Sequence, residues 1–287
     1  MMKLIEKANI LIEALPFIKQ FYGKTMIIKY GGSAMIDPRL KEMVIQDIIL
    51  MKYVGINPVI VHGGGKHISE LMQRLGKEVL FLDGLRVTDK ETMDITEMVL
   101  TGAVNKEIVS LLNLHGGKAV GVSGKDGMLI EAKKKTIINS KDYGFVGEIT
   151  KINPKILEVL DQADFIPVVS PIGFSKDGHT FNINADNAAG EIAAALKASK
   201  LILLTDIRGV CMVKDDESTL ISSLKISEVQ GLKDNGIIKE GMLPKIDSCI
   251  KAFEKGVEKI HIIDGRISHS ILLELFTEEG IGTQIIK

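Results

Sequence analysis

The chain has 287 residues, and its 36 Lys and Arg residues against 37 Asp and Glu residues leave a formal net charge of −1. Without a positive field to hold phosphate backbones or anionic lipid, we expect a protein that binds neither nucleic acid nor a membrane surface. The hydrophobic share of 45% and the charged share of 25% are ordinary for globular proteins, and they exclude disordered and fibrous classes.

The first 24 residues predict a helix that stands apart from the rest of the fold, and Pro16 is expected to kink or end it. A helix outside the main fold often packs on a neighbouring molecule, so we expect an oligomerisation element; packing on its own subunit is the alternative. The heptad-like apolar stripe of this helix consists of Leu4, Ala8, Leu11, Leu15 and Ile18.

Beyond this helix, short β-branched runs that mostly end in glycine alternate with longer helical patterns. Near-continuous apolar strands are typical of a parallel sheet covered on both faces, so we predict an α/β fold with an open, mainly parallel central sheet and helices on both sides. Ligands of such sheets bind beyond the carboxyl ends of the strands, where the glycines lie. The predicted strands are 25–32, 58–65, 118–127, 166–173, 201–210 and 259–265, and the predicted helices are 38–54, 65–76, 89–114, 153–162, 186–198 and 242–255.

Two predicted strand ends carry glycine clusters of the same kind, KYGGS at 29–33 and HGGG at 62–65. Backbone amides at a helix N-terminus attract anions, and Lys29 adds a full positive charge. The glycine spacing fits neither a P-loop nor a dinucleotide fingerprint. We therefore expect a phosphate or carboxylate ligand, although one such turn alone would be equally consistent with a tight βα turn. His62 is expected to be structural.

Three other places carry candidate site residues. In an extended segment, Asn182, Asn184 and Asp186 would point to the same side, with Asp186 at or near the start of a helix. A proline in the first turn of the last predicted helix places Lys245 within that helix. Taken alone, the first group reads as a helix N-cap, and Arg86, which follows a turn, reads as a solvated arginine.

Together these pieces suit phosphoryl transfer, because its transition state spreads negative charge that fixed cations and amides stabilise. The two lysines would supply the cations, and a carboxylate would orient them. The six histidines have no metal-ligand spacing, so we expect a metal ion to enter with the nucleotide. Two isolated cysteines, Cys211 and Cys249, are too few for a disulfide framework and predict a cytoplasmic protein. The segment after 166–173 is rich in turn formers and predicts a boundary between two lobes near 175.

The motifs KYGGSAM, VIVHGGGKHI, LDGLRVT, SGKDG, FNINADNAAGEIA, LLTDIRGV, GMLPKI and HIIDGR occur in this order along essentially the whole chain. This set resembles the acetylglutamate kinases of the amino-acid kinase family. The resemblance implies transfer of the ATP γ-phosphoryl group to the side-chain carboxylate of N-acetyl-L-glutamate, giving an acyl phosphate in arginine biosynthesis. It implies ATP with Mg²⁺ as a substrate complex and no tightly bound cofactor. It also places acetylglutamate in a lobe over 25–175 and ATP in a lobe over 176–287.

The same resemblance implies a role for individual residues. Lys29 and Lys245 would stabilise the transition state, and Asp186 would hold both. Family members usually show two glycines before the Met of GMLPKI, and Glu240 stands in place of the first. The binding residues implied are Gly31 and Gly32 for the phosphoryl group; Gly64, Gly65, Arg86, Asn182 and Asn184 for acetylglutamate; and Thr205, Asp206, Val210, Gly241, Met242 and Lys245 for the nucleotide.

The N-terminal helix and the tail HSILLELFTEEGIGT resemble the arginine-inhibited, hexameric members, in which interlaced N-terminal helices join dimers. This implies a homo-oligomer, a trimer of dimers, with L-arginine as inhibitor. Glu274 would take the guanidinium or α-ammonium group, and the turn 280–282 would expose backbone groups to the ligand. The alternative for the tail is an amphipathic helix that covers the sheet. The residues implied for the inhibitor are His261, Glu274 and Gly280, with Lys200 as a further candidate.

Three other functions compete with this interpretation. A kinase of the same fold could act on acetylaminoadipate or another amino-acid carboxylate, with Arg86 and Asn182 serving a longer substrate. A non-catalytic ligand-binding module is disfavoured because Lys29, Asp186 and Lys245 are all retained. A nicotinamide-dependent enzyme is disfavoured by the failed glycine fingerprint.

Overall fold

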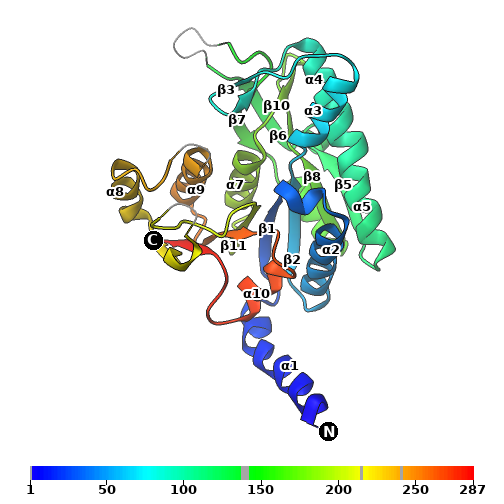
Figure 1. The fold of residues 1–287 in the computed structure, drawn as a ribbon. Helices are drawn as coiled ribbons and strands as arrows, with labels where there is room; N and C mark the ends of the chain where they lie inside the picture. Colours follow the sequence, from blue (N-terminus) through cyan, green and yellow to red (C-terminus); the bar gives the residue numbers. More distant parts are fainter. Residues whose placement is uncertain (1, 137–141, 214–215, 240–241) are drawn as a thin grey trace.

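The computed structural model describes residues 2–136, 142–213, 216–239 and 242–287. Its centre is an eight-stranded sheet in the order β12-β14-β13-β11-β1-β2-β8-β5, with helices on both sides (Figure 1). Neighbouring strands are parallel except β13 and β14, which are antiparallel. The predicted α/β class with an open, mainly parallel sheet is confirmed. The strands are β1 (Thr25–Tyr30), β2 (Asn57–His62), β5 (Ala119–Ser123), β8 (Ile166–Ser170), β11 (Lys200–Thr205), β12 (Ser223–Lys225), β13 (Ile260–Asp264) and β14 (Thr283–Ile286).

Two small sheets lie beyond the carboxyl ends of the central strands, in the upper part of the molecule in Figure 1. They help to frame the space above the central sheet, where the glycine clusters emerge. One has the order β10-β9-β6-β7 and contains β6 (Ile130–Lys134), β7 (Gly147–Ile152), β9 (Ile172–Phe174) and β10 (Thr180–Asn182); the other pairs β3 (Phe81–Leu82) with β4 (Leu85–Arg86).

Ten α-helices are found among the described residues, together with short 3₁₀ turns and one π-helical segment. Several begin at side chains that cap free backbone amides, as at Asp37 before α2 and Asp89 before α4. The helices are α1 (Met2–Phe21), α2 (Pro38–Tyr53), α3 (Gly65–Arg74), α4 (Lys90–Glu97), α5 (Asn105–Leu114), α6 (Lys155–Gln162), α7 (Ala185–Ala195), α8 (Val229–Asp234), α9 (Leu243–Glu254) and α10 (Ser270–Phe276).

The core forms two hydrophobic layers, one on each face of the central sheet. Successive strand residues point to opposite faces, so Met26 and Ile28 of β1 join one layer and Ile27 joins the other. The first layer packs against α2 to α5 and α10, and the second packs against α6, α7 and α9. Burial on both faces explains why the central strands read as almost continuous apolar runs.

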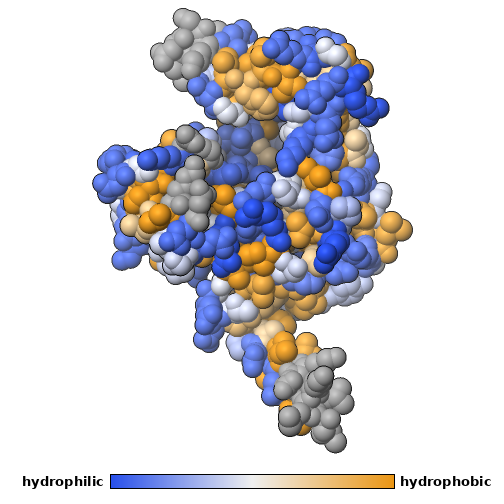
Figure 2. All heavy atoms as spheres, viewed as in Figure 1, coloured by the Kyte–Doolittle hydropathy of each residue, from blue (hydrophilic) through white to orange (hydrophobic). Residues whose placement is uncertain are grey.

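Two local expectations differ from the structure. Pro16 was expected to kink or end the first helix, and the helix does not end there, because α1 continues to Phe21. The single helix expected over 89–114 contains a π-helical segment, η2 (Met98–Val104), between α4 and α5. Helix α1 projects from the body of the molecule (Figures 1 and 2), and Leu11 and Leu15 of its predicted stripe are exposed.

Candidate active site

The described structure brings the two predicted lysines and the predicted carboxylate together above the carboxyl end of β1. Lys29 Nζ lies 3.0 Å from Asp186 Oδ1, and Lys245 Nζ lies 3.3 Å from Asp186 Oδ2. The side chains of Lys29 and Asp186 are 10% and 9% exposed, whereas that of Lys245 is 25% exposed. One carboxylate therefore bridges two ammonium groups from distant parts of the chain.

Two packed helices hold this bridge in place. Asn184 caps α7 by accepting hydrogen bonds from the amides of Asp186 (2.9 Å) and Asn187 (3.1 Å). Pro244 lies in the first turn of α9, which places Lys245 beside it. Gly190 of α7 lets the two helices approach, because an added Cβ would lie 3.1 Å from the Cβ of Ala252.

The segment before Asp186 departs from the sequence prediction. Residues Asn182, Asn184 and Asp186 were expected on one side of an extended segment, but β10 ends at Asn182 and α7 begins at Ala185. The capping preference of Asn184 starts the helix earlier than the extended pattern allowed. The expected place of Asp186 near the helix N-terminus is correct.

The charges around Asp186 favour its ionised form. Burial by itself would raise its pKa, but the ammonium groups of Lys29 and Lys245 outweigh burial and hold the pKa of Asp186 below its usual range. The cluster thus carries two cations and one anion, and its net positive charge suits a ligand with several negative charges.

The glycine loop after β1 passes close to this cluster. A Cβ at Gly31 would lie 2.6 Å from Lys29 Nζ, and a Cβ at Gly32 would lie 2.5 Å from Asp206 Oδ1. Gly32 also has φ of +72°, a conformation that side chains disfavour. The amide of Ser33 donates a hydrogen bond to Asp206 Oδ1 (2.6 Å), which ties the loop to the end of β11.

A cavity of about 180 Å³ lies beside the lysine cluster. Its wall includes Ala185, the residue directly before Asp186. Figure 2 shows a recess between the upper part of the molecule and the part that carries α8 and α9. All five residues predicted to hold acetylglutamate line the cavity: Gly64, Gly65, Arg86, Asn182 and Asn184.

Arg86 is the charged group of this cavity, and it is 6% exposed. Its Nη2 donates to the carbonyl of Gly65 (2.7 Å) and to Ser69 Oγ (2.8 Å), and its guanidinium lies 4.8 Å from the centre of the Phe81 ring. Among the described residues, no carboxylate lies within ion-pair distance of it, and burial lowers its pKa. A buried cation without a counter-ion favours an anionic ligand.

Of the predicted nucleotide residues that the structure describes, Thr205 and Asp206 lie at the end of β11, and Lys245 lies in α9. The hydroxyl of Thr205 donates hydrogen bonds within the protein, to the carbonyls of Ile207 (3.0 Å) and Ile263 (3.3 Å). Asp206, by contrast, is exposed. Val210 is buried and its amide donates to Thr283 Oγ1 (2.8 Å). Met242 lies directly before α9. Gly241 and the unusual Glu240 lie outside the described residues.

The sequence prediction assigned no role to the pair formed by Asp264 and Arg266, although it noted the motif HIIDGR. Asp264 ends β13 beside Thr205. Arg266 donates to both carboxylate oxygens of Asp264, from Nε to Oδ1 (2.9 Å) and Oδ2 (3.1 Å) and from Nη2 to Oδ2 (2.7 Å). The signal that could have identified them is a charged pair directly after a strand whose carboxyl end lies at the same edge as Lys29.

A second polar cluster brings together all four residues implied for arginine. Lys200 Nζ lies 2.8 Å from His261 Nε2, and His261 Nδ1 lies 2.6 Å from Glu274 Oε1. Burial, with the charge of Lys259, lowers the pKa of Lys200 to about 8. A Cβ on Gly280 would lie 3.0 Å from Glu274 Oε2.

One detail of the arginine prediction is wrong. The turn 280–282 was expected to expose backbone groups to a ligand, but the amides of Ile281 (2.8 Å) and Gly282 (3.1 Å) donate to Glu274 Oε2. The carboxylate needs these donors because it is 8% exposed. Lys200 Nζ also lies 5.2 Å from the centre of the Phe21 ring, so the end of α1 covers the cluster.

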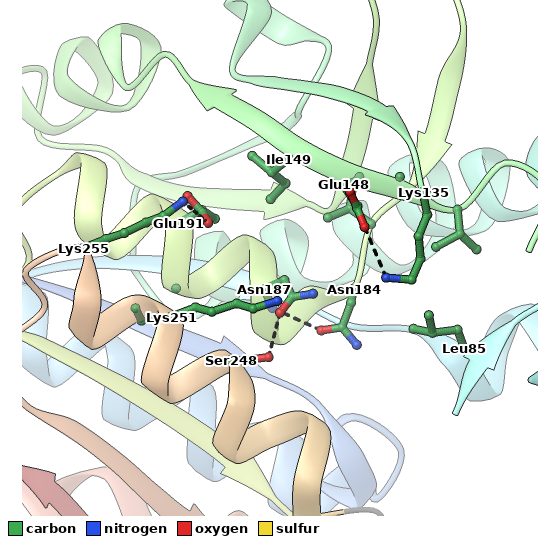
Figure 3. A pocket seen from close by; sticks show the side chains of 15 residues that line it. Leu85, Lys135, Glu148, Ile149, Asn184, Asn187, Glu191, Ser248, Lys251 and Lys255 are labelled. Atoms are coloured by element: carbon green, nitrogen blue, oxygen red, sulfur yellow. Dashed lines mark hydrogen bonds and ion pairs between the residues drawn. The ribbon is translucent and has the colours of Figure 1, made fainter. Parts of the chain in front are cut away.

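A larger cavity of about 310 Å³ lies between β7 and the pair α7 and α9. In Figure 3, Lys135 pairs with Glu148 and Lys255 pairs with Glu191, which neutralises two of its three lysines. The larger and the smaller cavity share four lining residues, Leu85, Val146, Ile183 and Asn184, which form a common wall between them.

Among the described residues, no group of three or more His, Cys, Asp or Glu side chains is placed to hold a metal ion. No helix in the same part of the chain has the length and apolar character needed to span a membrane.

Residues 24–264 match the model of the amino acid kinase family, so the chain belongs to this family. It is similar to the acetylglutamate kinase of Caldanaerobacter subterraneus subsp. tengcongensis, with 56% identity over 283 residues that cover 99% of this chain and 94% of the relative.

Among solved structures, the chain resembles N-acetylglutamate synthase from Neisseria gonorrhoeae. The complex with coenzyme A and N-acetyl-glutamate gives a TM-score of 0.86 at 29% identity, and the match covers 98% of this chain and 63% of the synthase. The complex with coenzyme A and L-arginine gives a TM-score of 0.82 at 27% identity, covering 98% and 65% of the two chains. This chain therefore spans slightly less than two thirds of the synthase.

Proposed function

We propose that this protein transfers the γ-phosphoryl group of ATP to the side-chain carboxylate of N-acetyl-L-glutamate, giving N-acetylglutamyl 5-phosphate in arginine biosynthesis. The observation that carries the proposal is the position of the Lys29–Asp186–Lys245 bridge beside a cavity whose buried Arg86 lacks a counter-ion. The names of the curated relatives, at 53–56% identity over nearly the whole chain, support this substrate.

In the proposed reaction Arg86 holds the α-carboxylate, because a guanidinium can grip both of its oxygens. Asn182, Asn184 and the amides of Gly64 and Gly65 hold the rest of acetylglutamate. The side-chain carboxylate is ionised at neutral pH, so its attack on the γ-phosphorus needs no general base.

The transferring group then lies between the two substrates, where the two lysine ammonium groups stabilise the charge on its oxygens. Asp186 keeps both lysines in position, and the amides of Gly31 and Gly32 cradle the group. ATP with Mg²⁺ binds to the lobe over 176–287, beside Thr205 and Asp206.

The experiment is a coupled assay of ADP release with four acceptors: acetylglutamate, glutamate, aspartate and acetylaminoadipate. We expect the highest kcat/KM with acetylglutamate. A preference for acetylaminoadipate would favour the rival kinase, and turnover of no acceptor would favour a non-catalytic module.

We also propose that L-arginine inhibits the enzyme at the cluster of Lys200, His261 and Glu274, and that α1 joins dimers into a hexamer. The exposed apolar side chains of α1 support the second part, and the position of Phe21 over Lys200 links the helix to the cluster. Arginine at millimolar concentration, with substrates near their KM, should lower the rate of the wild-type enzyme but not that of Glu274→Gln. Equal rates of the wild-type enzyme with and without arginine would contradict inhibition.

A further inference from the structure

His62 ends β2 directly before the glycines that line the substrate cavity, and its ring is completely buried. Its Nδ1 lies 2.7 Å from the carbonyl of Gly63, and its Nε2 lies 3.0 Å from Ser170 Oγ and 3.2 Å from Asn105 Nδ2. Both ring nitrogens are therefore used within the protein, which removes His62 as a proton acceptor for the reaction.

The neighbours of His62 decide which nitrogen carries the proton. Asn105 Nδ2 also donates to the carbonyl of Val168 (2.9 Å), which fixes the orientation of its amide, and an amide nitrogen can only donate. Nε2 must then accept, so the proton is on Nδ1 and is donated to Gly63. Burial lowers the pKa of His62 to about 4, which keeps this single proton in place at neutral pH.

The hydrogen bond from His62 fixes the plane of the next peptide. In a trans peptide the carbonyl and the following amide point in opposite directions. With the carbonyl of Gly63 held toward the ring, the amide of Gly64 points away from it. No described residue accepts a hydrogen bond from that amide, and Gly64 lines the substrate cavity.

The π-helical segment η2 supports the same arrangement from the other side. The Leu100 carbonyl accepts from the amide of Asn105, five residues on, and lies 3.1 Å from Ser170 Oγ, whose single hydrogen is shared between this carbonyl and His62 Nε2. The Leu100 side chain closes over Gly64, where an added Cβ would lie 2.5 Å from its Cδ2. Such π-helical turns are rare and often occur near functional sites.

We propose that His62, held by Asn105 and Ser170, is a positioning residue that directs the Gly64 amide toward the anionic acceptor substrate. This inference rests on the proposed function of the cavity. It predicts an effect on acceptor binding that is separate from the effect on ATP, because no residue of the network is among those expected to contact the nucleotide.

Two substitutions separate the positioning role from a role in folding. An asparagine amide can take the place of Nδ1–H, so His62→Asn keeps the donor to Gly63, whereas His62→Gln reaches only the Nε2 position. We expect His62→Gln to raise the KM for acetylglutamate by about tenfold, the effect of about one lost hydrogen bond. The KM for ATP should stay within about twofold, and His62→Asn should keep both KM values near those of the wild-type enzyme.

A third variant covers the case in which neither histidine variant folds. Ser170→Ala keeps the ring and removes one of its supports, and it should raise the KM for the acceptor alone by about threefold. An equal rise in the KM values for acetylglutamate and ATP would overturn the proposal. It would also be overturned if the KM for the acceptor were unchanged in both Ser170→Ala and His62→Gln. The wild-type acceptor panel is run first, and the variants are compared with whichever acceptor is turned over. Failure of acetylglutamate as substrate is thus distinguished from failure of the positioning role.

Discussion

At Asp186 a single buried carboxylate restrains two ammonium groups that would otherwise repel each other. Without it, Lys29 and Lys245 would move apart, and the positive charge proposed to face the transferring phosphoryl group would become diffuse. Their pairing with one carboxylate also explains why two lysines can lie so close together in a part of the protein where water is scarce.

Replacement of either lysine by alanine should lower kcat far more than it raises the KM for acetylglutamate. In the proposed reaction each ammonium group opposes charge that grows during transfer, and loss of one such group commonly costs about 10² to 10³ in rate. Asp186→Asn should also act mainly on kcat. Steady-state kinetics with Lys90→Ala, an exposed lysine in an i,i+4 pair, serve as the control. A near-wild-type kcat in Lys29→Ala or Lys245→Ala would contradict the assignment.

Arg86→Lys should raise the KM for acetylglutamate and change the KM for ATP little. Lysine keeps the positive charge but loses the planar fork that reaches Gly65 and Ser69 while facing the cavity. The two KM values are measured in the same assay. An equal change in both would indicate a folding defect and not a lost substrate contact.

At the scale of elements, the sequence was most informative where burial is most complete. Central strands such as β1 and β11 are covered on both faces, so their apolar runs are unbroken and their positions could be predicted within a few residues. Strands β12 and β14 were not predicted, because each is short and lies near the edge of the sheet. The π-helical segment was also missed, since side-chain periodicity does not distinguish it from an α-helix.

The convergence of site residues was predictable for a geometric reason. Carboxyl ends of parallel strands meet at one edge, which is why Lys29 and the glycines near Gly64 could be assigned to one site from sequence. Contacts made by side chains across the sheet were not predictable. The contact of Lys200 with His261 and the amides that bind Glu274 depend on how separate elements pack, and no local pattern encodes that packing.

Deletion of residues 1–20 should reduce the proposed hexamer to dimers and weaken inhibition by arginine, while most of the catalytic activity is retained. The reason is that α1 exposes apolar side chains and its last residue, Phe21, covers Lys200. Light scattering measures the assembly, and the coupled assay measures inhibition. An unchanged mass, with unchanged inhibition, would leave α1 without either role.

At the scale of the whole molecule, buried titratable groups connect stability with pH. The pKa of His62 is lowered by burial from 6.5 to about 4, so the native protein binds fewer protons than the unfolded chain between these values. This contribution to stability is complete above pH 6.5 and is lost as the pH falls toward 4. Burial raises the pKa of Asp47 from 3.8 to about 6, so at this residue the native protein binds more protons than the unfolded chain. The contribution of Asp47 to stability therefore increases as the pH falls.

On a change from pH 7 to pH 5, His62→Asn should lose about 2 kcal/mol less unfolding free energy than the wild-type protein. The variant lacks the titrating ring, and the contribution of Asp47 is common to both proteins and cancels. Urea unfolding at the two pH values, at equal protein concentration, measures the difference. Parallel losses in both proteins would show that His62 does not remain neutral in the native state.

Strand β14 has a consequence for the order in which the protein forms during synthesis. Among the described strands, β12 (Ser223–Lys225) pairs in the sheet with β14 (Thr283–Ile286) alone, so it cannot join the sheet until residue 286 has left the ribosome. Thr283, which holds the amide of Val210, arrives equally late. All residues that line the smaller cavity, up to Ala185, are therefore synthesised well before β14, on which β12 and the amide of Val210 depend. A nascent chain would contain the complete lining of its proposed acceptor cavity well before the last contacts of the segment proposed to bind ATP.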